Sequence, residues 1–481
     1  MRLLANPELV RHWRMELRPR RVIAVIGVVV VLCTVGLLLA SYHPDGLRGD
    51  AITLYYGLLA VHYGVLMMWS AGACGDSLVR ERAEKTIDAW RTTRLSAGEL
   101  IVGILLGRPA LIAVGVAASL PVVALLAYLA DVPARAVILT YAFLLVVAAL
   151  SGLLGLWLSL TLARAGGGAL AAFVVLIFPA YGFSFLASPL VGLATLGVWP
   201  VVSSFHPGAT LLERPTLLGV SVPWVVAAAV VYLGVGAWLV RMLRQNLKRE
   251  VEDMQLLSRR DAVLFALYVN LMFVVLLDPV PRPLSVTSLA MALMLNVGLL
   301  YLVGVLILAP RPRLLAWWRG VGGARRWVDL AEDGLPWPWM VLVAGAAYLT
   351  LVGAGAAGLL GGPVPPGDTA ARLAIATVFA VRDVTFLQWC RVTALKRPVM
   401  VGLLVLYLVY VLVLAVGSAP FWSHGDPGEW LALPYNVLNV DLSPAGLAVR
   451  WTVLQIAVIL LLLADIRRRL ERPMRVPARG M

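Results

Sequence analysis

Long, nearly uncharged apolar runs recur along this chain, for example at residues 22–40, 51–73 and 136–162. A helix rises 1.5 Å per residue, so about 20 residues cross a hydrocarbon core of about 30 Å. Inside lipid every backbone polar group must be bonded within the chain, and these runs lack the alternating polarity of barrel strands. Only 14% of the residues are charged, against about a quarter in soluble proteins. The sequence therefore predicts an all-α polytopic membrane protein.

The hydropathy pattern predicts about twelve transmembrane helices in two groups. A basic segment at 241–261 separates a six-span domain, residues 1–245, from a second, divergent bundle of about six spans, residues 246–481. The tenth span is the weakest, because Arg382 and Asp383 interrupt it. The predicted spans are 22–41, 51–74, 109–129, 136–162, 167–189, 217–240, 262–277, 284–308, 337–360, 373–390, 398–417 and 447–466.

The basic residues predict the orientation of the spans. Most of the 40 Lys and Arg residues fall in alternate loops and in the two terminal segments. By the positive-inside rule these segments are cytoplasmic, and so are both termini. The three cysteines are scattered among apolar runs, which indicates neither a disulfide framework nor a metal site.

The segment from Gly75 to Glu99, between the second and third spans, is unusually rich in charge of both signs. Val79, Ala83, Ile87 and Trp90 are spaced to share one face of a helix, and charged residues cover the rest. Pairs four residues apart, such as Arg80 with Glu84, add local ion pairs. Periodicity alone is equally typical of an interfacial helix that has no partner.

The order of residues in this segment resembles the first cytoplasmic loop of type-2 ABC exporter permeases. The matching positions are Glu81-Arg82, Thr86-Ile87-Asp88, Thr92-Thr93, Leu95-Ser96, Glu99, Gly103 and Leu105-Leu106-Gly107. Lys85, Arg94 and Ile104 depart from the family pattern, which has glycine, proline and lysine there. The segment 6–11 also looks like the amphipathic helix that precedes the first span in such permeases. The apolar stretch 169–205 is too long for one span; it predicts a span followed by a short re-entrant outer segment, which looks like that of such permeases, or one long kinked helix with an interfacial tail.

This resemblance implies the membrane-spanning permease subunit of an ATP-driven type-2 ABC transporter, exporting an unidentified substrate across a bacterial plasma membrane. It implies a coupling helix that docks on a separate ATPase subunit, itself a dimer. The coupling residues it implies are Glu81, Arg82, Thr86, Asp88, Leu95, Ser96 and Glu99. The permease would pair with a second copy or a second permease and contact membrane lipid; no nucleic acid is expected.

The chain itself is expected to hold no catalytic residue, metal or cofactor. A phosphate-binding loop requires a lysine directly after glycine, and none of the three lysines follows one. ATP and Mg²⁺ are therefore expected on the partner ATPase.

Other readings stay open at this point. A secondary transporter would carry charges near the bilayer midplane, and a non-transporting scaffold fits the same spans. His62 lies within span two, where a packed, hydrogen-bonded histidine is favoured over a proton relay or metal ligand. The segment 309–336, with Trp317, Trp318 and Trp327, predicts an interfacial helix, or a second docking surface. By position, 382–397 is a candidate second coupling element.

Overall fold

The computed structural model consists of two compact units, residues 1–249 and 250–481, and each is described by itself. Helix is the main element in both units. The structure describes residues 6–42, 50–84, 94–161, 216–217, 220–247, 257–276, 286–320, 332–357, 366–393, 401–408 and 444–471.

The first unit begins with a short helix and a long one, joined by two residues. Its described elements are α1 (Pro7–Glu16), α2 (Pro19–Ser41), α4 (Ala51–Ala83), α6 (Ala97–Gly107), α7 (Ala110–Leu129), α8 (Ala134–Thr161), the two-residue strands β1 (Thr216–Leu217) and β2 (Val220–Ser221), and α13 (Trp224–Asn246). The two strands form an antiparallel hairpin that leads into α13.

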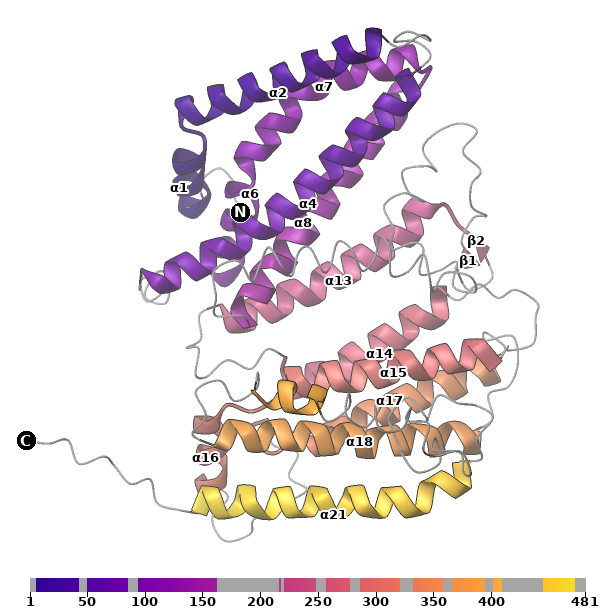
Figure 1. Cartoon of the computed structure of the whole chain (residues 1–481). Coiled ribbons are helices and arrows are strands. Elements are labelled where there is room, and N and C mark those ends of the chain that lie inside the picture. Colours follow the sequence, from indigo (N-terminus) through magenta and orange to yellow (C-terminus); the bar gives the residue numbers. More distant parts are fainter. Residues whose placement is uncertain are drawn as a thin grey trace, which may run out of the picture. The chain divides into compact units, whose positions relative to one another are not determined.

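Helices α4 and α8 run side by side and form the most extensive contact of the unit (Figure 1). Gly155 of α8 lies so close to α4 that a methyl group there would overlap the carbonyl oxygen of Ala71. Ser70 Oγ donates to the Ala148 carbonyl at 2.8 Å, and Ser151 Oγ donates to the Met67 carbonyl at 2.8 Å. Small residues and hydroxyl bonds of this kind hold apolar helices together inside lipid.

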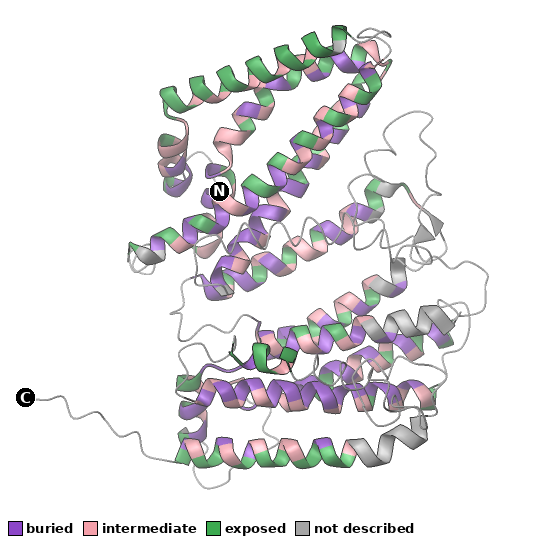
Figure 2. Ribbon diagram, in the orientation of Figure 1, coloured by how far each residue is buried: buried purple, intermediate pink, exposed green. Residues whose placement is uncertain are grey.

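Helix α2 stands apart from this core. Its side chains are exposed along nearly its whole length, whereas α4 and α8 bury one side each (Figure 2). Its main neighbour is α7, where Gly115 allows a close approach of Val25.

The second unit is built around α18. Its described helices are α14 (Arg259–Leu276), α15 (Val286–Leu306), α16 (Arg311–Gly320), α17 (Trp337–Ala356), α18 (Pro366–Val392) and α21 (Pro444–Glu471). Helix α18 contacts α15, α17 and α21. Between α14 and α15, the buried amides of Asn270 and Asn296 exchange two hydrogen bonds of 2.8 and 2.9 Å.

Arg382 and Asp383 interrupt the apolar run of the tenth predicted span, but they do not interrupt its helix. Helix α18 continues through both residues, because neighbouring helices supply them with partners. Arg382 donates to Asp383 at 2.7 Å and to Gln455 of α21 at 2.6 Å. Tyr301 of α15 donates to the other Asp383 oxygen at 2.7 Å. The stretch 382–392 is therefore the largely buried end of α18, and residues 394–397 of the candidate second coupling element lie outside the described residues.

The Trp-rich segment begins with a sharp bend after α15. The axes of 295–306 and 311–319 differ by 76°. The amide of Gln388 supports the bend by donating to the Ala309 carbonyl and accepting from its N–H, both at 3.0 Å. Leu314 and Trp318 of α16 are buried against Ile466 of α21. Helix α16 thus crosses the end of the bundle with its apolar side covered; Trp327 lies outside the described residues.

Five helices within the described ranges are long and apolar enough to cross a membrane. They are 19–39, 51–81, 110–129, 134–160 and 337–356, and the bent pair formed by 295–306 and 311–319 makes a sixth if it counts as one span. These helices indicate a helical, multi-pass integral membrane protein. The predicted span 167–189 lies outside the described residues, and only 401–408 of span 398–417 is described.

Candidate coupling site

The charged segment is partly an extension of the second span. The prediction placed the end of that span at residue 74, but α4 runs without interruption to Ala83. Its 33 residues extend for about 50 Å, which exceeds the hydrocarbon core of about 30 Å. The predicted pair between Arg80 and Glu84 is present, at 2.7 Å, and adds a local ion pair at the helix end.

Of the seven predicted coupling residues, Glu81 and Arg82 lie at this end of α4. Glu81 is only 3% exposed, and the side chain of Arg82 is not among those described. Thr86 and Asp88 fall in the range 85–93, which lies outside the described residues.

The other predicted residues lie at the start of a short helix, before span three, that the sequence analysis did not predict. Ser96 is the N-cap of α6 and forms a capping box with Glu99. The Glu99 carboxylate accepts from the Ser96 N–H at 2.8 Å, and Ser96 Oγ accepts from the Glu99 N–H at 3.2 Å. Leu95, just before the cap, is half-buried. Helix α6 ends at Gly107, and Arg108 and Pro109 separate it from α7.

Helix α1 packs directly onto α6, and this contact is called the α1–α6 clasp below. A Cβ added at Gly103 would lie 2.8 Å from Glu8 Cβ, and one at Gly107 would lie 2.5 Å from His12 Cβ. The two glycines are four residues apart, as are Glu8 and His12. Each pair therefore lies on one face of its helix, and the two faces pack against each other over about one turn. Leu9, between them, is 2% exposed.

Polar and charged side chains of α1 pair with one another and with the end of α4. His12 Nε2 lies 3.0 Å from Glu8 Oε1, and both side chains are buried. Arg11 lies 3.5 Å from Glu8 and donates to the Glu81 carboxylate of α4. Burial raises the pKa of Glu8, but the adjacent His12 and the positive charges of Arg11 and Arg108 outweigh it, so its pKa lies below the ordinary value.

Further bonds fix both ends of the clasp. Asn6 Nδ2 donates to the Glu99 carbonyl at 2.8 Å, and Trp13 Nε1 donates to the Leu106 carbonyl at 3.3 Å. Glu16, at the end of α1, lies 3.2 Å from Arg108. Helix α1 thus joins the two helices that flank residues 85–93 in the chain: it contacts the end of α4 before them and α6 after them.

Sequence reasoning missed most of this constellation. It named Glu81 as a coupling residue but included Arg11 only in the amphipathic segment 6–11, and it used Gly103 and Gly107 only as motif positions. A small-xxx-small pair in α6 facing an i, i+4 pair in α1 is the signal that points to such a contact.

His62 is packed and hydrogen-bonded, as predicted. Its Nδ1 lies 2.6 Å from the Tyr141 hydroxyl, and its Nε2 lies 2.9 Å from Ser119 Oγ. Because Ser119 donates its proton to the Val116 carbonyl at 2.7 Å, it accepts from Nε2, and Tyr141 donates to Nδ1. Both ring nitrogens of His62 are therefore occupied.

Comparisons with protein-family models, with curated proteins and with solved structures found no match. The role of the clasp is therefore inferred from its own residues.

Proposed function

We propose that this chain is the membrane-spanning permease subunit of an ATP-driven type-2 ABC transporter, energised by a separate ATPase dimer. It would export a substrate that its apolar spans do not identify, across a bacterial plasma membrane. In this proposal both termini, the clasp and residues 85–93 face the cytoplasm.

The observation that carries the proposal is the clasp beside the motif-bearing segment. Arg11 of α1 pairs with buried Glu81 at the end of α4, and α1 packs on Gly103 and Gly107 of α6. A force on residues 85–93 would act directly on α4 and α6, and through α6 on α7, so that these helices would move together. Such a joint supports a role in passing an ATPase movement to two spans, because differential binding shifts a conformational equilibrium.

The predicted coupling residues then divide by role. Glu81 joins the end of α4 to α1 beside the clasp, since its carboxylate is buried and paired with Arg11. Ser96 and Glu99 shape the start of α6 through their capping box. Arg82, Thr86 and Asp88, with Leu95, are proposed to contact the ATPase.

Co-purification in mild detergent tests the proposal. The tagged wild type is expected to retain a nucleotide-binding protein that hydrolyses ATP, and Arg82→Ala/Asp88→Ala is expected to lose it. Glu84→Gln is the matched control, because Glu84 is exposed at the same helix end and pairs with Arg80, one turn away. A wild type that retains no nucleotide-binding protein would refute the proposal.

A secondary transporter is the alternative, and one observation favours it. Asp383 is fully buried within α18 and bonded to Arg382 and Tyr301. Ionisable groups buried within transmembrane segments mark ion pathways in many transporters. Under this alternative, proteoliposomes show potential-driven proton uptake without nucleotide, and Asp383→Asn abolishes it. Under the ABC proposal no such flux occurs. A scaffold would show neither this flux nor a bound ATPase.

A further inference from the structure

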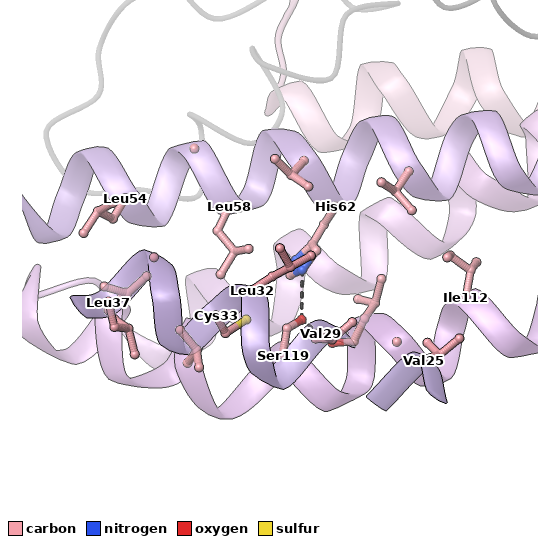
Figure 3. Close-up of a pocket in the computed structure, with 18 of the residues that line it drawn as sticks. Val25, Val29, Leu32, Cys33, Leu37, Leu54, Leu58, His62, Ile112 and Ser119 are labelled. Atoms are coloured by element: carbon pink, nitrogen blue, oxygen red, sulfur yellow. Dashed lines mark hydrogen bonds between the residues drawn. The ribbon is translucent and has the colours of Figure 1, made fainter. Parts of the chain in front are cut away.

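A cavity of about 590 Å³ opens between α2, α4 and α7 of the first unit (Figure 3). Val25, Val29 and Leu32 of α2 form one wall, and Leu54 and Leu58 of α4 form the wall facing it. This cavity takes no part in the clasp or in the proposed ATPase contact.

The chemistry of the walls selects a hydrocarbon occupant. Nearly all lining side chains are aliphatic, and the polar atoms of His62 and Ser119 are taken up by each other and by Tyr141 and the Val116 carbonyl. Apart from these two residues, Cys33 and Thr53 are the lining residues whose side chains carry a polar or sulfur atom, so the walls offer a polar solute few partners. Apolar cavities exclude water and accept apolar ligands.

The length of the cavity matches one acyl chain. Its α2 wall runs from Val25 to Leu37, which at 1.5 Å per residue is about 18 Å. One leaflet of a hydrocarbon core of about 30 Å is about 15 Å thick. Helix α2, which forms one wall of the cavity, is an apolar span with an exposed surface, so the cavity lies next to the surrounding lipid.

One end of the cavity is basic. Arg21 precedes Val25 by four residues, so both lie on the same face of α2. Arg18, Arg20 and Arg21 are all exposed. Glu16 is the carboxylate at this end, 3.5 Å from Arg21, and its other oxygen lies 3.2 Å from Arg108. The positive charges outnumber it, which suits a phosphate group.

We infer that this cavity binds one acyl chain of an anionic phospholipid, whose phosphate lies at Arg21 and its neighbouring arginines. In the orientation expected from the positive-inside rule, the lipid belongs to the cytoplasmic leaflet. The site stands whether or not the chain is an ABC permease, because it depends only on the first unit.

The glycines of the cavity provide a test. A Cβ at Gly36 or Gly57, which line the cavity, meets nothing within 4 Å, so Gly36→Leu/Gly57→Leu fills the space without a backbone clash. Gly27 and Gly64 lie on the same two helices, have equally open surroundings and do not line the cavity. Gly27→Leu/Gly64→Leu is therefore the matched control.

The full-length protein is placed in phosphatidylcholine nanodiscs that contain a trace of phosphatidylglycerol with a diazirine in one acyl chain. After illumination, mass spectrometry is expected to find adducts in 25–37, 53–65 and 112–126. The cavity-filled variant should give about tenfold less labelling, as expected when a site is overpacked, and the control should match the wild type.

Headgroup selection is tested separately, on a variant that leaves the cavity intact. Photoreactive phosphatidylglycerol should label more than photoreactive phosphatidylcholine, and Arg21→Gln should reduce that preference about fivefold. Arg135→Gln, exposed at the start of α8, should not. Equal labelling by both lipids would overturn the anionic-lipid assignment. Undiminished labelling of the cavity-filled variant would overturn the cavity as the site.

Discussion

The α1–α6 clasp should open when its two glycines are enlarged. In Gly103→Ala/Gly107→Ala the new methyl carbons would lie 2.8 Å from Glu8 Cβ and 2.5 Å from His12 Cβ. Carbon atoms normally approach to about 3.5–4.0 Å, so α1 must retreat by about 1 Å. Overpacking of this kind costs about 1–3 kcal/mol. A cost of about 2 kcal/mol lowers the docking equilibrium of α1 about thirtyfold.

Hydrogen–deuterium exchange of residues 7–16 in nanodiscs measures this equilibrium. The double variant should lose protection by that factor, while α2 and α4 keep theirs. Gly64→Ala is the control, because it is the same Gly-to-Ala substitution within a helix and its new Cβ would meet nothing within 4 Å. If α1 is as protected in the double variant as in the wild type, the close packing of α1 on α6 is wrong.

Three further outcomes follow from other contacts. Asn270→Leu should lower stability by about 1 kcal/mol because it removes both hydrogen bonds between the buried Asn270 and Asn296 amides, and Asn270→Leu/Asn296→Leu should recover part of the loss in thermal unfolding in detergent; a double variant less stable than the single one would contradict this. Gly155→Val should prevent α4 and α8 from packing at Ala71, seen as aggregation in size-exclusion chromatography, and a monodisperse variant of unchanged melting temperature would argue against that contact. The pKa of Glu8 is lower in the folded state than its ordinary value of 4.5. The ionised Glu8 therefore contributes its full stabilisation of the fold above pH 4.5, and this contribution is lost as the pH falls through the lower folded-state pKa. The melting temperature should fall in that acid range for the wild type and show a smaller fall for Glu8→Gln, whereas equal profiles would exclude Glu8 as the cause.

The helical class and the positions of many spans could be predicted from hydropathy. Helices α2, α7, α8 and α17 begin within three residues of the predicted starts, because an apolar run must be helical in lipid wherever it occurs. Periodicity also predicted the Arg80–Glu84 pair, since residues four apart meet on any helix.

Contacts between distant segments could not be predicted in this way. Arg382 and Asp383 resemble a break until Gln455 and Tyr301, more than seventy residues away in sequence, supply their hydrogen bonds. Glu81 resembles a surface docking residue until Arg11 of α1 covers it. Local sequence carries no record of these partners, so it indicated which residues were unusual but not what they contact.

Site-specific photocrosslinking from residue 88 tests the central claim most directly. A photoreactive amino acid placed at Asp88 in living cells, with the rest of the chain unchanged, reports which protein touches the motif-bearing segment. The ABC permease account predicts a crosslinked protein that carries a nucleotide-binding loop and whose yield changes when cellular ATP is depleted. Adducts that contain only lipid, or only proteins without such a loop, would contradict it.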